Sequence, residues 1–375
     1  MKLKSLAIKG VAMMLILSGC SSSENKEKSK DSEVEETQES TKEKSKDSDE
    51  STKEIKEEFV GLYPVDIDGI YGYIDKTGKI VINPQFDKAD SFSEGLAAVM
   101  IDGRYGFIDK TGKIVINAQF DVAYSFSEGL AKVGVGDWGN MKYGFIDKTG
   151  KIVITPQFDE AAPFFEGLAT VGIGDDWKNR KYGYIDKIGQ YVIRPQFDEA
   201  CEFSEGLAAV KIDGIYGFID KTGRYIINPQ FYYPSVFSEG LAGVMTDAGY
   251  GYIDKTGKIV INTQFDEAAP FSEGLAIVGV GDLDNRKYGF IDKTGKIVIN
   301  PQFDYAWRFS EGLAIIGVGD DWNDMKHGYI DKTGKIVINP QFDIPHDFSG
   351  GVAEVRINGE QCYIDKTGKF IYPKK

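Results

Sequence analysis

Four short segments rich in glycine and aspartate carry the side chains best suited to recognition. Three of them each hold one of the chain's four tryptophans, and the fourth holds a leucine at the matching position. An indole combines a flat apolar face with one N–H donor, which suits stacking on a sugar or filling a groove of a protein partner. The candidate binding residues are Trp138, Trp177, Leu283 and Trp322, with the neighbouring aspartates Asp137, Asp176 and Asp321.

Two other interpretations of these segments stay open. Each tryptophan could fold back over its own hairpin and cover the glycine-rich strand. The acidic residues around Asp176 and Asp321 could gather oxygen ligands for calcium, but they lack the spacing of a known calcium loop. We therefore expect solvated turns and no metal site.

Catalytic chemistry has little support in the sequence. The chain has only two histidines, His327 and His346, and it lacks HExxH, G-x-S-x-G and phosphate-loop motifs. His327 occupies a tyrosine position of a predicted core strand, so we expect a packed, hydrogen-bonded histidine there. The sequence predicts a protein that is not an enzyme and has no cofactor.

The candidate segments belong to a motif that recurs nine times. The spacings between successive units run 34, 34, 38 and 39 residues, and then the same series repeats, so a block of four units is duplicated and followed by one more. Residues shared by all units are expected to be structural, and function is expected where the units differ. The units begin at Gly61, Gly95, Gly129, Gly167, Gly206, Gly240, Gly274, Gly312 and Gly351.

The second unit illustrates the local structure that each copy predicts. An apolar run, 96–101, is followed by Asp-Gly and a second run, 105–109, which indicates a hairpin with a type I′ turn. Asp109-Lys110-Thr111-Gly112 suits a type I turn closed by a glycine bulge, and a third strand follows at 114–116. Each unit is thus predicted to be a three-stranded antiparallel meander, and the fold class is all-β.

Side-chain alternation predicts how the meanders pack. Both faces of each meander are apolar, so successive sheets should stack face to face, with the glycine of each Tyr-Gly pair admitting the adjacent sheet. The proline of Asn-Pro-Gln-Phe is expected to end the third strand. Because neither terminus leaves a strand to share, we expect an open, twisted, solenoid-like array. The alternative is a closed β-propeller-like ring.

The repeat resembles the WG repeat family, in which a Trp-Gly pair precedes a pattern like Y-I-D-x-x-G-K-x-V-I-x-P-x-F and a later F-S-E-G-L-A. The resemblance spans roughly residues 61 to 372. Seven units have Tyr-Gly instead, the eighth has His327-Gly328 and the ninth has Gln361-Cys362. The resemblance implies an all-β repeat domain, 59–375, with a binding or interaction role and no shared enzymatic activity.

The N-terminus carries export signals. A basic start and a short apolar run precede Leu17-Ser18-Gly19-Cys20, which resembles the lipobox of bacterial lipoproteins. This resemblance implies a signal peptide, 1–20, with Cys20 as the lipidation site. The next segment, 21–58, is almost free of apolar residues and is predicted to be a disordered, charged spacer.

The net charge and the predicted export limit the classes of partner that the protein is expected to bind. The formal net charge is −14, which argues against nucleic acid as a partner. We expect a lipid-anchored protein on the extracytoplasmic face of the cell membrane, touching the membrane through its anchor only. Its expected function is a repeat scaffold that binds an envelope or extracellular protein or glycan. The alternative is a structural or assembly spacer of the envelope with no dedicated ligand site.

Overall fold

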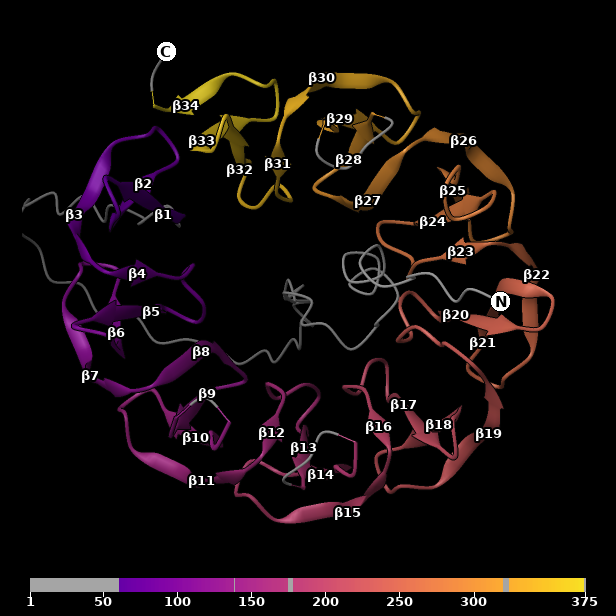
Figure 1. Ribbon diagram of the computed structural model, residues 1–375, viewed down its shortest axis with the longest axis horizontal. Helices are drawn as coiled ribbons and strands as arrows, with labels where there is room; N and C mark the ends of the chain where they lie inside the picture. Colours follow the sequence, from indigo (N-terminus) through magenta and orange to yellow (C-terminus); the bar gives the residue numbers. More distant parts are fainter. Residues whose placement is uncertain (1–60, 138, 175–177, 320–323, 374–375) are drawn as a thin grey trace, which may run out of the picture.

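The structure is a computed structural model that describes residues 61–137, 139–174, 178–319 and 324–373. These residues form nine small antiparallel sheets and no helix. The sheets, which we call blades and number in chain order, are arranged around a closed ring (Figure 1). The all-β prediction is confirmed, while the arrangement is the propeller-like alternative and not the open solenoid-like array.

Each blade contains the three strands predicted for its unit, and seven of the nine blades gain a fourth. Blade 1 contains β1 (Leu62–Ile67), β2 (Ile70–Asp75) and β3 (Ile80–Phe86). Blade 2 contains β4 (Lys88–Ala89), β5 (Leu96–Ile101), β6 (Arg104–Asp109) and β7 (Ile114–Phe120). Blade 3 contains β8 (Val122–Ser127), β9 (Leu130–Val135), β10 (Lys142–Asp147) and β11 (Ile152–Phe158). Blade 4 contains β12 (Glu160–Ala161), β13 (Ala169–Ile173), β14 (Lys181–Ile185) and β15 (Tyr191–Phe197).

The second half of the chain continues the pattern. Blade 5 contains β16 (Glu199–Ala200), β17 (Leu207–Ile212), β18 (Ile215–Asp220) and β19 (Tyr225–Phe231). Blade 6 contains β20 (Leu241–Thr246), β21 (Gly249–Asp254) and β22 (Ile259–Phe265). Blade 7 contains β23 (Glu267–Ala268), β24 (Leu275–Val280), β25 (Lys287–Asp292) and β26 (Ile297–Phe303). Blade 8 contains β27 (Tyr305–Ser310), β28 (Leu313–Val318), β29 (Lys326–Asp331) and β30 (Ile336–Phe342), and blade 9 contains β31 (Ile344–Pro345), β32 (Val352–Ile357), β33 (Glu360–Asp365) and β34 (Phe370–Tyr372).

The fourth strand comes from the segment that links consecutive units. This segment leaves the outer strand of one blade and pairs with the next blade, as Lys88 and Ala89 pair with Met100 and Val99. These linking strands lie nearest the centre of the ring, and the third strand of each unit lies on its outer rim (Figure 1). Each link therefore joins neighbouring blades by hydrogen bonds as well as by packing.

Aromatic pairs repeat at the boundaries between blades. Phe107 of β6 meets Phe126 of β8 with ring centroids 4.9 Å apart in an edge-on arrangement. Where the first partner is tyrosine, its buried hydroxyl also donates to the linking segment, as Tyr184 does to the Cys201 carbonyl at 2.7 Å. Such pairs contribute about 0.5–1.5 kcal/mol beyond their burial. The core is thus a circular series of blade-to-blade contacts.

The ring closes without a shared strand. The Tyr363 hydroxyl donates to the Pro64 carbonyl, and the Gln361 amide oxygen accepts the Asp66 backbone N–H at 2.8 Å. Val65 packs in one buried cluster with Val352 and Tyr363. The prediction of an open array was wrong because it treated a shared strand as the means of closure, whereas blades 1 and 9 close by face-to-face packing.

The glycine of each Tyr-Gly pair has a different role from the one predicted. Tyr105 pairs with Phe120 and Phe107 with Ile116, so the outer strand bulges over Gly106. A Cβ there would lie 2.5 Å from the Ile116 carbonyl oxygen. The glycine therefore makes room for its own blade's outer strand and not for the adjacent sheet. In blade 9 the outer strand ends at Tyr372, before any such bulge, and Cys362 takes the glycine position.

Two further expectations about the outer strand were wrong. Its first two residues are exposed, Ile114 by 46% and Val115 by 42%, whereas Ile116 and Phe120 are buried, so the strand does not present two covered faces. The proline of Asn-Pro-Gln-Phe lies inside the strand, as Pro84 does in β3, and does not end it. Proline is tolerated there because the strand lies at the edge of its sheet and bulges.

Replacing Gly106 with alanine should destabilise the fold by about 3 kcal/mol, since the new methyl group meets fixed backbone atoms. Chemical denaturation monitored by circular dichroism would measure the change. Cys362→Ala, at the equivalent position of blade 9, is the control and should cost less than half as much. Equal losses for the two variants would contradict the bulge as the reason for glycine.

Candidate functional site

The repeated aspartates hold the turns between the second and third strands of each unit. Asp109 Oδ1 accepts hydrogen bonds from the Thr111 N–H at 2.9 Å, the Thr111 hydroxyl at 2.6 Å and the Lys113 N–H at 3.1 Å. The hydrogen bond from the Thr111 hydroxyl lowers the pKa of Asp109 below its usual value. These carboxylates serve turn geometry and are not aimed at a shared site.

The repeated glutamates connect neighbouring blades. Glu94 precedes β5, and its carboxylate accepts the Gly129 N–H at 3.1 Å and pairs with the Lys148 ammonium of blade 3 at 3.0 Å. Lys148 also donates to the Glu94 carbonyl. The same arrangement recurs at six further glutamates: Glu128, Glu166, Glu205, Glu239, Glu273 and Glu311. These groups are therefore part of the ring's framework.

The four longer hairpins belong to blades 3, 4, 7 and 8, so they form two adjacent pairs on opposite sides of the ring (Figure 1). Asp137 is exposed, and Leu283 is 70% exposed at its hairpin tip. Trp138, Trp177, Trp322, Asp176 and Asp321 lie outside the described residues, as does Cys20. Of the residues in the predicted recognition surface, the structure therefore describes Asp137 and Leu283, which lie on opposite sides of the ring.

The bases of two of these hairpins, those of blades 4 and 7, are fixed by ion pairs. In blade 7 the Arg286 guanidinium lies 2.7 Å from the Glu267 carboxylate, which also accepts the Tyr288 hydroxyl at 2.8 Å. Glu267 is only 2% exposed. In blade 4 the pair is Arg180 with Glu160 at 2.6 Å, in a more exposed setting. Two linking strands therefore anchor the hairpins through ion pairs.

His327 is a structural residue of blade 8. It is 7% exposed, its Nδ1 lies 3.3 Å from the Phe342 carbonyl oxygen, and Tyr305 meets its ring edge-on at 5.4 Å. Burial lowers its pKa below the usual value. The expected packed histidine is what the structure shows. In the parts of the chain that are described, no group of three or more His, Cys, Asp or Glu residues is placed to hold a metal ion.

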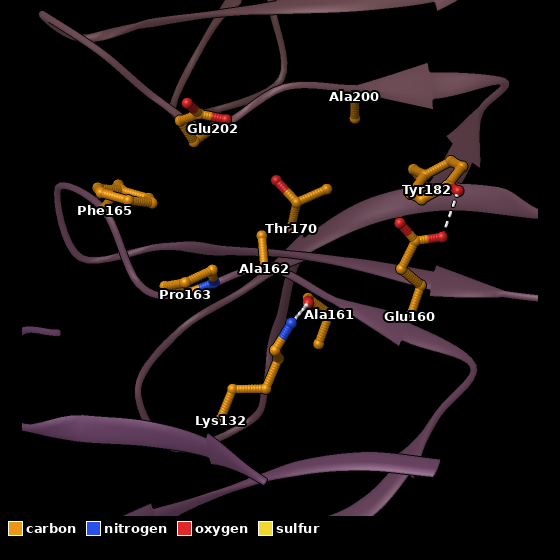
Figure 2. Close-up of a pocket in the computed structure, with 10 residues that line it drawn as sticks. All are labelled: Lys132, Glu160, Ala161, Ala162, Pro163, Phe165, Thr170, Tyr182, Ala200 and Glu202. Carbon is orange, nitrogen blue, oxygen red and sulfur yellow. Dashed lines mark hydrogen bonds between the residues drawn. The ribbon is translucent and has the colours of Figure 1, made fainter. Parts of the chain in front are cut away.

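A pocket of about 300 Å³ lies where blades 3, 4 and 5 meet near the inner strands (Figure 2). It combines Lys132 and Glu202 with small residues such as Ala162 and Thr170. Lys132 donates to the Ala161 carbonyl at 2.9 Å, and Tyr182 donates to Glu160 at 2.7 Å. Burial lowers the pKa of Lys132 to about 8 and raises the pKa of Glu202 to about 7.

Sequence reasoning missed this pocket because it located the differences between units only in the hairpins. The linking segments differ between units as strongly as the hairpins do, and the differences lie at the two successive positions that precede a repeated phenylalanine. That variation was visible in the sequence, but only the ring shows that these positions gather near its inner side (Figure 1). The pairs are Asp90-Ser91, Tyr124-Ser125, Ala162-Pro163, Cys201-Glu202, Ser235-Val236, Ala269-Pro270, Trp307-Arg308 and His346-Asp347.

The geometry defines a nine-bladed, propeller-like ring built from one repeated unit. Comparison with known families agrees with this, since the WG containing repeat matches eight times along the chain. The chain therefore belongs to the WG containing repeat family. The matched residues are 71–105, 105–137, 143–177, 182–214, 216–248, 250–283, 288–322 and 328–360.

Comparison with solved structures gives distant likenesses. An uncharacterized protein from Listeria monocytogenes EGD-e has a TM-score of 0.42 at 11% identity, over 67% of this chain and 93% of that chain. Puromycin hydrolase gives 0.38 at 11% identity, over 82% of this chain and 58% of that one. The acylaminoacyl peptidase of Pyrococcus horikoshii gives 0.37 at 10% identity, over 82% and 51%. Likenesses at this level assign no activity.

No curated protein matches the chain. In the described ranges, no helix is long and apolar enough to cross a bilayer.

Proposed function

We propose that the protein is a non-enzymatic assembly scaffold of the bacterial cell envelope, anchored by a lipid on Cys20 and holding its ring outside the membrane. The observation that carries this proposal is the use of the repeated polar groups. The aspartates and glutamates present in the units bind their own turns and neighbouring blades, as Asp109 and Glu94 do. A ring stabilised in this way suits a rigid support for envelope components.

A second candidate function is capture of a protein or glycan by the long hairpins. Leu283 favours it, because a leucine that is 70% exposed at a hairpin tip is available for contact with a partner. The hairpins also lie in two adjacent pairs across the ring, so they could engage two copies of one partner at once.

One experiment separates the two candidates. Full-length protein and a variant with Trp138, Trp177, Leu283 and Trp322 replaced by alanine would be compared in cross-linked envelope extracts. The scaffold proposal predicts the same associated components and an unchanged unfolding midpoint. Loss of those components at unchanged stability would favour capture by the hairpins. If neither form associates with any envelope component, the scaffold proposal is wrong.

The anchor is tested separately. Cys20→Ala should move the protein from the membrane fraction to the soluble extracytoplasmic fraction, and persistence in the membrane fraction would contradict lipidation at Cys20.

A further inference from the structure

The pocket between blades 3, 4 and 5 holds charged residues that the repeat does not require. Lys132 stands where the other units have Pro64, Ala98, Thr170, Ala209, Gly243, Ile277, Ile315 and Glu354, so it is the single cation among the nine units. In Figure 2, Lys132 and Glu202 lie at opposite edges of the pocket, with Ala162 and Thr170 between them.

The duplication of the four-unit block provides an internal comparison. Each residue of the pocket has a counterpart 145 positions later in the chain. Ala162 and Pro163 correspond to Trp307 and Arg308, and Glu202 corresponds to Asp347. The two copies thus show what the same framework does when this site carries large side chains and when it carries small ones.

In the second block the large side chains are engaged with their surroundings. Trp307 packs against the buried cluster that contains Ile315, the counterpart of Thr170, and it stacks parallel to Tyr305 with centroids 6.5 Å apart. The Arg308 Nε lies 3.2 Å from Asp347 Oδ2. The protein itself therefore supplies an aromatic body and a guanidinium at this site.

In the first block, the small residues leave the pocket open. Ala162 and Pro163 line it and do not fill it, and Glu202 also lines it. Among the described residues, Glu202 has no ion pair, although its counterpart Asp347 has one with Arg308. Such a carboxylate is stabilised most by a ligand that carries both a positive charge to pair with it and an apolar part to fill the pocket.

We propose that this pocket binds a small organic cation, an ammonium or guanidinium carried on a flat apolar body. The cation pairs with the Glu202 carboxylate, and the body occupies the space next to Ala162 and Thr170 that corresponds to Trp307 in the second block.

Lys132 does not prevent this binding. Its ammonium is held away from Glu202, where it donates to the Ala161 carbonyl and lies 3.6 Å from the centroid of the Tyr124 ring. Lys132 thus makes its contacts at the edge of the pocket opposite to Glu202 (Figure 2). Its counterpart in the second block is Ile277, so Lys132→Ile is a matched variant that removes the residual repulsion and should tighten binding of a cation.

The pH dependence follows from the groups that line the pocket. Burial raises the pKa of Glu202 to about 7 and lowers the pKa of Lys132 to about 8. As the pH rises from 6 to 8, Glu202 ionises and Lys132 begins to lose its charge, and both changes favour a bound cation. Tyr182, whose pKa burial raises to about 12, stays neutral, and Glu160 remains paired with Arg180. Binding should therefore strengthen across this range.

The test is calorimetric titration of the full-length protein with 2-phenylethylguanidine, whose charge is constant between pH 6 and 8, and with 3-phenylpropionate as the anionic control. We expect one bound cation and no bound anion. Glu202→Gln should weaken binding of the cation at least tenfold, because a charge-assisted hydrogen bond contributes about 1.5–3 kcal/mol.

The double variant A162W/P163R is the sharpest control, because it copies the residues of the second block. It should fold with an unchanged unfolding midpoint and should no longer bind the cation. The proposal is overturned if wild type does not bind the cation, if the anion binds equally well, or if either Glu202→Gln or A162W/P163R binds as tightly as wild type. None of these outcomes depends on whether the ring acts as an envelope scaffold.

Discussion

Replacing Arg286 with methionine should lower the free energy of unfolding by about 3–5 kcal/mol, because it leaves a buried carboxylate without its cation. Glu267 is 2% exposed, and after the change only the Tyr288 hydroxyl would remain hydrogen-bonded to it. One of its oxygens already lacks a hydrogen-bond partner within the described structure. Urea denaturation followed by circular dichroism would measure the loss.

Two matched variants make this prediction specific. Arg180→Met breaks the corresponding pair of blade 4, but the Glu160 side chain is 49% exposed, so the cost should be about 1 kcal/mol or less. The double variant E267V/R286M copies Val122 and Met141, the counterparts in the first block, and should recover most of the lost stability. A single variant R286M no less stable than R180M would show that the Glu267 pair contributes little.

Replacing Tyr363 with alanine should lower the free energy of unfolding by about 3–5 kcal/mol. The contact between blades 1 and 9, which we call the seam, should open before the rest of the ring. Tyr363 is 2% exposed, its hydroxyl donates to the Pro64 carbonyl, and its ring lies 5.8 Å from that of Tyr63. Hydrogen exchange should therefore accelerate in β1 and β33 before it does in blades across the ring. Denaturation would give the total change, and exchange measured by mass spectrometry would locate it.

The conservative variant Tyr363→Phe is the control for that substitution. Four other units already have phenylalanine at this position, Phe107 and Phe145 among them, so the ring tolerates the loss of the hydroxyl where packing is kept. Tyr363→Phe should retain the closed seam and lose only the hydrogen bonds of the hydroxyl, which involve the Pro64 carbonyl, the Gln361 amide and the Glu354 carboxylate. Uniform acceleration of exchange around the whole ring in Tyr363→Ala would contradict a localised seam.

The sequence predicted the local structure of each unit well because that structure depends on short-range chemistry. Asp102 and Gly103 adopt positive φ angles of 51° and 75°, as a type I′ turn requires, and Gly112 does so at 83°. These conformations follow from residue types a few positions apart. The number of units was likewise readable from the recurring spacing, and it equals the number of sheets.

The closure of the ring was not predictable from the same kind of reasoning. It depends on contacts between residues nearly 300 positions apart, such as Pro64 with Tyr363. Nothing in either segment marks it as a partner of the other, although Gln361, which stands where seven other units have tyrosine, makes one of the closing hydrogen bonds. The angle between successive blades decides between a ring and an open array, and that angle results from packing across every boundary.

The candidate site was only partly predictable for a related reason. The hairpin residues were found because extra length and tryptophan are conspicuous in a repeat. The pocket near Glu202 draws residues from three successive blades, so it exists only once blades 3, 4 and 5 are packed together. Its signal in the sequence was the replacement of Trp307-Arg308 by Ala162-Pro163 between the two blocks.

The closed ring is tested most directly by joining its two ends. Cysteines would replace Asp66 and Gln361, which meet across the seam, in a chain whose three native cysteines are changed to alanine. A cross-linker that reaches about 10 Å, one sheet-to-sheet spacing, should join them within one molecule at any protein concentration. In an open stack of nine sheets the same residues would lie about 80 Å apart. Labelling of both cysteines with no intramolecular product would therefore contradict the ring.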